Sequence, residues 1–213
     1  MRCDKKDLLL YGVTDRSWLG DRTLAQQVEA SLRGGATMIQ LREKHMDRGS
    51  ILAQALELRE LCGRYGVPLI LNDDAELAQA AGADGVHVGQ SDMEAGRVRA
   101  LLGEDKLIGV SARTVEQALA AQAAGADYLG VGAMSPTGTK QDTRPVSYDT
   151  LKAICAAVDI PVVAIGGIGA GNVAELAGSG IAGVAVVSAL YAQPDVEAAT
   201  RSLRAQVERV VGP

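Results

Sequence analysis

The chain has 213 residues, of which 47% are hydrophobic, so it can bury one core and does not have a disordered composition. Aromatic residues make up only 3% and the formal net charge is −5, which argues against stacking platforms for single-stranded nucleic acid and against attraction to nucleic acid or anionic lipid. The apolar runs have the length of strands, so we expect an aliphatic core and no binding to nucleic acid or membrane.

Short aliphatic runs alternate with longer Ala- and Leu-rich segments of helical period along the whole chain. We expect strands at residues 8–13, 37–41, 68–71, 85–88, 107–110, 127–131, 161–165 and 182–186. Capping boxes, each with a Glu or Gln three residues later, predict helix starts at Thr23, Ser91 and Thr114. Eight strand–helix units in strict alternation predict an α/β fold, a single (β/α)8 TIM barrel that forms one domain over residues 1–213.

Two segments of the chain resemble each other, residues 81–89 and residues 124–132. Each reads Ala-Gly-Ala-Asp and then an apolar run that ends in Val-Gly. In each, a Gly ends a helix and a strand follows. We interpret the pair as repetition within one barrel rather than as two domains.

Polar residues gather at the C-terminal ends of the predicted strands, the end where barrel enzymes place their sites. They follow all eight strands, and the opposite loops hold mostly Gly, Ala and Pro. The candidate site residues in this set are Gln40, Arg42, Lys44, Asn72, Asp73, Asp92, Ser111, Thr137, Thr139, Lys140, Gly167, Val187 and Ser188.

Gln40, Arg42 and Lys44 alternate along the end of the second predicted strand. If the strand continues through Lys44, all three side chains point into the barrel mouth. Two cations and an amide suit a polyanion such as a diphosphate. The alternative is solvated surface charge with Glu43 as its partner.

Asp73 and Asp92 follow neighbouring strands and, with phosphate oxygens and water, suit one Mg²⁺ ion. Capping is the alternative for each. Asp73 or Asp74 could cap a helix that starts near Ala75, and Asp92 could stand in the first turn of a helix after Ser91.

Two further features suit an anion. Thr137, Thr139 and Lys140 stand in the longest loop, which could be a flap over a phosphate or an ordinary polar loop. Gly167, Val187 and Ser188 follow the last two strands, where backbone N–H groups of this fold recurrently hold phosphate.

The chain offers no activated nucleophile and only two histidines, so neither covalent catalysis nor a multi-His metal site is expected. His87 lies within a predicted strand, where a packed, hydrogen-bonded histidine is favoured over a catalytic one. Cys3, Cys62 and Cys155 are scattered, which is typical of reduced thiols and indicates a cytoplasmic protein.

Together these motifs resemble those of thiamine-phosphate synthases. The resemblance lies in residues 11–15, 39–44, 71–73, 85–92, 108–112, 130–132, 136–140, 165–168 and 187–190. It implies a transferase of thiamine biosynthesis that joins a pyrimidinylmethyl diphosphate to a thiazole phosphate, or to its carboxylate, and releases pyrophosphate. It also implies Mg²⁺ as the cofactor and the two substrates as the partners. A homo-oligomer is compatible with it.

The resemblance assigns roles to the candidate residues. The pyrimidine diphosphate would be held by Gln40, Arg42, Lys44, Asn72, Ser111 and Lys140, with Arg42, Lys44, Lys140 and Ser111 acting in catalysis. Asp73 and Asp92 would ligate Mg²⁺. The thiazole phosphate would be held by Thr137, Thr139, Gly167, Val187 and Ser188.

The sequence departs from the family pattern in two places. Residues 133–135 lack a Pro and an aromatic that usually precede the flap, and Arg113 stands where a His is common. The rival interpretations are a related thiazole tautomerase, which relies on that His, a sugar-phosphate epimerase or isomerase, and a ligand-sensing barrel. Arg113 argues against the tautomerase, and a rim rich in cations and amides argues against an epimerase or isomerase, which needs paired acid and base groups. A sensing barrel would not need the complete set of Arg42, Lys44, Asp73, Asp92 and Lys140.

Overall fold

The computed structural model describes residues 3–136 and 145–212. Its strands are β1 Leu10–Val13, β2 Met38–Leu41, β3 Leu69–Asn72, β4 Gly85–Val88, β5 Leu107–Ala112, β6 Tyr128–Gly132, β7 Val162–Ile165 and β8 Gly183–Val186. Its α-helices are α1 Leu24–Gly34, α2 Arg48–Tyr65, α3 Ala75–Ala81, α4 Ala95–Leu102, α5 Val115–Ala123, α6 Tyr148–Ala157, α7 Ser188–Tyr191 and α8 Val196–Val211. Three short 3₁₀ helices are η1 Lys5–Leu8, η2 Arg16–Trp18 and η3 Val173–Leu176.

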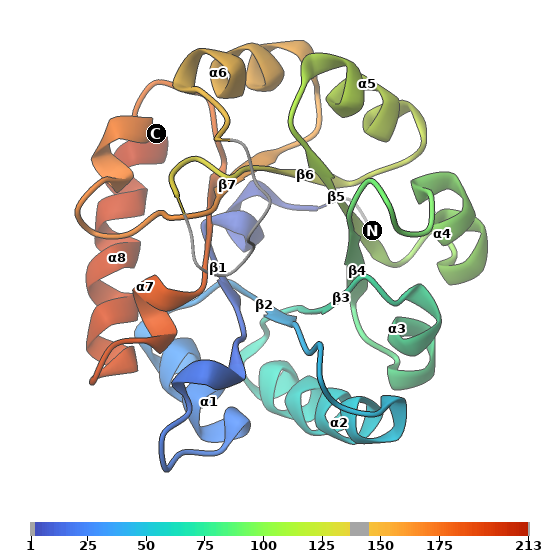
Figure 1. The fold of residues 1–213 in the computed structure, drawn as a ribbon, viewed down its shortest axis with the longest axis vertical. Helices are drawn as coiled ribbons and strands as arrows, with labels where there is room; N and C mark the ends of the chain where they lie inside the picture. The colour runs from blue at the N-terminus through green and yellow to red at the C-terminus, as the bar shows by residue number, and fades with distance from the viewer. Residues whose placement is uncertain (1–2, 137–144, 213) are drawn as a thin grey trace.

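The strands form a closed parallel barrel in chain order, in which β1 also pairs with β8. The α-helices form a ring around it (Figure 1). The predicted (β/α)8 fold is therefore confirmed, and each expected strand is present within a few residues. Within the parts of the chain that the structure describes, no helix is both long and apolar enough to cross a membrane.

The strict alternation of strand and helix is wrong at one connection. Between β7 and β8 the helical segment is the four-residue η3. Glycines are frequent on both sides of it, and Gly178 and Gly180 adopt positive φ. Because Gly disfavours a helix by about 1 kcal/mol relative to Ala, this stretch supports only a short 3₁₀ turn.

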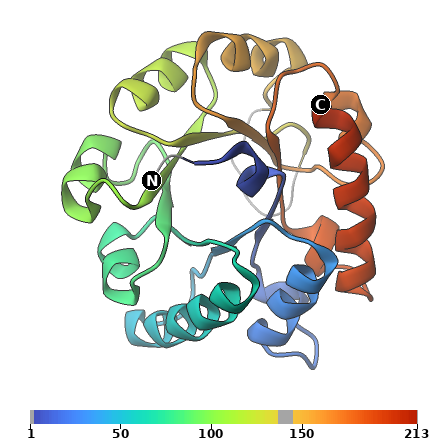
Figure 2. The same ribbon diagram turned by 180° about the vertical axis from the view of Figure 1, so that it is seen from behind.

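Alternate residues of each strand pack on opposite sides of the barrel wall. Ile39 and Leu41 of β2 belong to the core beneath the helices, whereas Met38 belongs to the cluster inside the barrel. Leu8 of η1 is fully buried in that inner cluster. Figure 2 shows η1 lying across the barrel opening at the end opposite the strands' carboxyl ends.

The repeated Ala-Gly-Ala-Asp segments make the same contact at the N-terminal ends of the strands. The Asp84 carboxylate accepts a hydrogen bond from the Leu69 N–H at 2.8 Å, and the Asp127 carboxylate accepts one from the Ile108 N–H at 2.8 Å. Each aspartate therefore fastens the start of the preceding strand to its own strand. We call these two contacts the aspartate clamps.

We expect Arg99→Ala to lower the free energy of unfolding by about 2 kcal/mol, because Arg99 supports one clamp and is largely buried. Its guanidinium donates to the Asp127 carboxylate at 2.6 Å and to the carbonyls of Gly103, Lys106 and Gly125. Only 15% of its side chain is exposed. Urea unfolding measures the loss.

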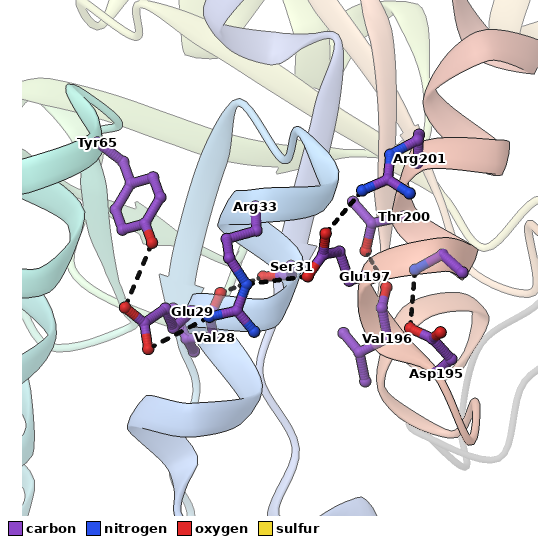
Figure 3. A network of polar contacts seen from close by, with 11 residues as sticks. Val28, Glu29, Ser31, Arg33, Tyr65, Asp195, Val196, Glu197, Thr200 and Arg201 are labelled. Atoms are coloured by element: carbon purple, nitrogen blue, oxygen red, sulfur yellow. Dashed lines mark hydrogen bonds and ion pairs between the residues drawn. The ribbon is translucent and has the colours of Figure 1, made fainter.

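Arg33→Ala is the matched control. Arg33 bridges Glu29 of α1 and Glu197 of α8 on an exposed surface (Figure 3). Exposed ion pairs contribute little, so this variant should unfold at the wild-type urea concentration. An equal loss in both variants would contradict the importance of the clamp.

Candidate active site

A cavity opens at the C-terminal end of the barrel. Among the predicted site residues, those that line it are Gln40, Arg42, Asn72, Ser111, Gly167, Val187 and Ser188. They come from β2, β3 and β5 and from the segments after β2, β7 and β8. Asn72 and Ser111 lie within β3 and β5 rather than after them. His87 and Arg113 also line the cavity.

The prediction that the second strand continues through Lys44 is wrong. β2 ends at Leu41, and Lys44 is exposed beyond it, outside the cavity lining. The Thr14 hydroxyl accepts the Arg42 N–H at 3.0 Å, and the Glu43 carboxylate accepts the Lys44 N–H at 3.1 Å. Beyond Leu41, the backbone N–H groups of Arg42 and Lys44 therefore donate to side-chain oxygens and not to the carbonyls of a neighbouring strand.

The alternative of solvated surface charges with Glu43 as their partner does not describe the charges beside the end of β2. Glu43 pairs with Arg16 of η2. The Arg42 guanidinium lies 3.9 Å from the Asp15 carboxylate, and only 13% of the Arg42 side chain is exposed. Arg42 is therefore a mostly buried cation at the cavity, a suitable position for binding an anion.

A chain of hydrogen bonds crosses the barrel interior, and all of its members except Tyr128 line the cavity. The Gln40 amide N–H donates to the Tyr11 hydroxyl at 2.6 Å, and the Tyr11 and Tyr128 hydroxyls are 3.0 Å apart. His87 Nδ1 lies 3.2 Å from the Tyr128 hydroxyl, and His87 Nε2 lies 3.0 Å from Ser111 Oγ. We call this series the interior chain.

Burial shapes the chemistry of the interior chain. Desolvation raises the pKa of Tyr11 and of Tyr128, so both hydroxyls keep their protons and can donate. His87 is packed and hydrogen-bonded, as the sequence predicts. Neither Tyr11 nor Tyr128 was predicted as a site residue, although each occupies an interior position of its strand in a protein without Phe.

The predicted metal ligands lie at the ends of β3 and β4. The Asp73 N–H donates to the His87 carbonyl at 2.8 Å, and Asp73 adopts φ +66°. One carboxylate oxygen of Asp92 accepts the Gly89 N–H at 2.7 Å. The capping alternative is confirmed for Asp74, which caps α3, so Asp73 is left beside the cap. It is wrong for Asp92, because α4 begins at Ala95 and Glu94 caps it. The capping box predicted at Ser91 is therefore wrong.

The chemistry of this donor set fits Mg²⁺. No group of three or more His, Cys, Asp or Glu side chains that could hold a metal occurs in the described parts of the chain. Mg²⁺ usually binds through one or two carboxylates and completes its shell with water and substrate phosphates. Two carboxylates at one rim can therefore hold it when a diphosphate is present.

Gly166 and Gly167 follow β7 with φ of +94° and +67°. A Cβ on Gly167 would lie 2.7 Å from Ser135 Cβ and 2.8 Å from the Pro136 carbonyl oxygen. Close packing against the segment after β6 therefore requires this Gly, whether or not a phosphate binds beside it. The Asn172 side chain, which was not among the predicted site residues, donates to the Gly167 carbonyl at 2.8 Å and accepts the Gly169 N–H at 2.9 Å.

Thr137, Thr139 and Lys140 lie outside the described residues. The segment just before them is held to the end of β7, because the Met134 and Ser135 N–H groups donate to the carbonyls of Ile165 and Gly166 at 3.0 Å. The unusual residues 133–135 are therefore fixed by backbone bonds that need neither a Pro nor an aromatic side chain.

A family model described as thiamine monophosphate synthase matches residues 10–190, which includes all eight strands. The chain belongs to this family. It is 50% identical over 202 residues to a thiamine-phosphate synthase of Chloroflexus aurantiacus, covering 94% of this chain and 93% of that one. It is 48% identical over 199 residues to a thiamine-phosphate synthase of Ruminiclostridium cellulolyticum, covering 93% and 95%.

A solved structure gives the same relationship. Thiamine phosphate pyrophosphorylase from Pyrococcus furiosus superposes with a TM-score of 0.90 at 38% identity, covering 98% of this chain and 99% of that chain. The similarity to the thiamine monophosphate synthase family therefore extends over the whole barrel. Arg113, the second departure from the family pattern, lines the cavity, and its backbone N–H donates to the Gln117 side chain at 2.8 Å.

Proposed function

We propose that the protein is a thiamine-phosphate synthase, a transferase of thiamine biosynthesis that joins a pyrimidinylmethyl diphosphate to a thiazole phosphate and releases pyrophosphate. The observation that carries the proposal is the cavity, where Gln40, Asn72 and Ser111 of three strands meet Arg42, which directly follows β2. Family membership and the named relatives support the same activity.

The difficult step is the departure of pyrophosphate from the activated CH₂ group of the pyrimidine. Arg42, Lys44, Lys140 and Ser111 are proposed to stabilise the charge that develops on the leaving group. Lys44 would have to reach over the rim from its exposed position. Asp73 and Asp92 would hold Mg²⁺, which when bound supplies positive charge to the diphosphate oxygens.

The thiazole phosphate is proposed to bind beside this site, at Gly167, Val187, Ser188, Thr137 and Thr139. A second hollow adjoins the main cavity there, and Gly167 and Ser188 line both. Two substrates held side by side react as if at very high concentration, so the thiazole nitrogen needs no protein nucleophile to attack the pyrimidine carbon.

The setting of the reaction is also proposed. All three cysteines are free thiols, which favours the cytoplasm. We propose that residues 1–213 act as one domain whose partners are its two substrates and Mg²⁺, alone or as a homo-oligomer.

Mass spectrometry tests the proposed activity. The protein is incubated with Mg²⁺ and both substrates, and with each substrate alone. Thiamine phosphate should form only in the complete mixture. Its absence there, from a folded protein, would refute the proposal.

We expect Ser188→Ala to raise the KM for the thiazole phosphate about tenfold, because one hydroxyl donor to a charged group is lost. The KM for the pyrimidine diphosphate should not change. Steady-state kinetics with each substrate varied in turn measures both values. Equal changes, or a change for the pyrimidine alone, would show that the two anion sites are wrongly assigned.

Gly167→Val should also weaken thiazole phosphate binding more than pyrimidine diphosphate binding, but it is the less selective variant. Its Cβ would collide with Ser135 and Pro136 and displace the segment that leads toward Lys140. Calorimetry with each ligand on folded protein compares the two losses.

We expect no thiazole tautomerase activity. The Arg113 side chain has only N–H donors and no acceptor, so it cannot accept a proton as a neutral imidazole can. Exchange of thiazole protons with deuterium oxide, followed by NMR, measures the activity. Exchange at a rate that matches the synthase turnover would contradict this expectation.

A further inference from the structure

The hydrogen bonds of the interior chain have a direction. An amide N–H can only donate, so the Tyr11 hydroxyl accepts from Gln40. Buried hydroxyl hydrogens require acceptors, and the arrangement that gives one to both tyrosines has Tyr11 donating to Tyr128, 3.0 Å away. The Tyr128 hydroxyl then donates to His87 Nδ1. A neutral imidazole that accepts at Nδ1 carries its proton on Nε2 and donates it to Ser111 Oγ. The Ser111 hydroxyl hydrogen is therefore directed away from the chain.

Two glycines of the barrel wall, Gly109 and Gly130, leave the space that the Tyr128 and His87 rings occupy. A Cβ on Gly109 would lie 2.2 Å from Tyr128 Cζ and 2.5 Å from His87 Nδ1. A Cβ on Gly130 would lie 2.9 Å from His87 Cε1. Tyr11 and Tyr128 are at most 1% exposed, and His87 is 9% exposed. These contacts restrict the positions of the Tyr128 and His87 rings. Gln40, Tyr11, His87 and Ser111 line the cavity, whereas Tyr128 lies behind its lining, and Ser111 is the member at the end of the chain whose hydroxyl hydrogen is not used within it.

We propose that Tyr11, Tyr128 and His87 are positioning residues that orient the Ser111 hydroxyl as a hydrogen-bond donor toward the pyrimidine diphosphate. This inference rests on the proposed function of the cavity. The chain fixes one lone pair of Ser111 Oγ as the acceptor of the His87 N–H and leaves the O–H to the substrate. A preorganised donor of this kind stabilises developing charge without a reorganisation step.

A double-mutant cycle tests the proposal. Tyr128→Phe keeps the ring and removes the bond to His87, so kcat should fall about tenfold while the KM for the thiazole phosphate stays constant. In a Ser111→Ala background the same substitution should change kcat by less than about twofold, because the group it positions is absent. Equal losses in both backgrounds, or no loss in either, would overturn the proposal.

Tyr191→Phe is the matched control. Tyr191 is fully buried and its hydroxyl lies 3.3 Å from Ser31 Oγ, outside the interior chain. It should leave kcat unchanged in both backgrounds, and a loss equal to that of Tyr128→Phe would overturn the proposal. If Tyr128→Phe does not fold, Tyr11→Phe, which interrupts the chain one bond earlier, takes its place with the same criteria.

A measurement without substrate separates this inference from the proposed function. The protein has two histidines, so ¹⁵N spectra of the imidazoles can be assigned with a His45→Gln variant. The His87 ring should carry its proton on Nε2, and Tyr128→Phe should shift its Nδ1 resonance. A proton on Nδ1 would overturn the direction of the chain even in an active enzyme. Failure to form thiamine phosphate, with the expected spectrum, would instead refute the proposed function.

Discussion

Asp73→Asn should lower the rate of thiamine phosphate formation on the order of a hundredfold and remove its dependence on Mg²⁺, because one of the two carboxylates that hold the metal is neutralised. Asn is the informative substitute. Asp73 adopts φ +66°, a conformation that Asn tolerates and Ala does not, so the variant removes the charge without straining the backbone. Titration with Mg²⁺ in the activity assay, and calorimetry of Mg²⁺ with pyrimidine diphosphate present, measure the two losses.

Two neighbouring variants separate metal binding from folding. Asp92→Asn keeps an oxygen acceptor for the Gly89 N–H and should reproduce the loss seen with Asp73→Asn. Asp74→Ala removes the cap of α3, where Asp74 accepts the Leu77 N–H at 2.8 Å, and should lower the free energy of unfolding by about 1 kcal/mol while the dependence on Mg²⁺ remains. Near-normal activity of both Asn variants in the presence of chelator would refute the metal site.

Gly109→Ala should lower the free energy of unfolding by about 3 kcal/mol, because the added methyl overpacks a site where every neighbour is buried. The nearest atoms, in the Tyr128 and His87 rings, would be 2.2 to 2.5 Å from the new Cβ. Neither ring can withdraw without breaking the interior chain. Urea unfolding of the two proteins gives the difference.

Gly63→Ala is the control of opposite sign. Gly63 lies in α2, and a Cβ at this position would have no atom of the described residues within 4 Å beyond its chain neighbours and the backbone of its own helix. This variant should gain up to about 1 kcal/mol, since Ala favours a helix more than Gly does. Similar stability changes in the two variants would show that chain entropy, and not crowding inside the barrel, decides the result at Gly109.

The fold was largely predictable because each strand–helix unit carries its own periodic pattern, and eight such units leave one common architecture. Of the three capping boxes predicted from sequence spacing, the one at Ser91 is wrong, because Glu94 caps α4. Thr23 and Gln26 form the predicted capping box. At Thr114 the predicted box is half formed, because the Gln117 side chain accepts the Arg113 N–H instead of the N–H of Thr114. Neighbouring backbone groups compete for one amide, and sequence spacing does not decide between them.

The site was predictable only in part, and the missing part has a physical reason. Residues such as Gln40 and Ser111 could be selected because strand ends define the rim. The Tyr11 and Tyr128 hydroxyls meet across the barrel, although the residues are 117 positions apart, and no local pattern records that contact. The end of β2 at Leu41 escaped prediction for a similar reason, since the Thr14 side chain of another segment replaces the strand ladder there.

The aspartate clamps and the cavity lie at opposite ends of the barrel. The clamps fasten neighbouring strands at the N-terminal end, whereas the cavity lies at the C-terminal end. A substitution at the rim can therefore change which ligand is bound without weakening the aspartate clamps. A substitution at a clamp can change the free energy of unfolding without altering turnover. Such a separation makes a barrel evolvable, because new specificity and heat resistance can be acquired independently.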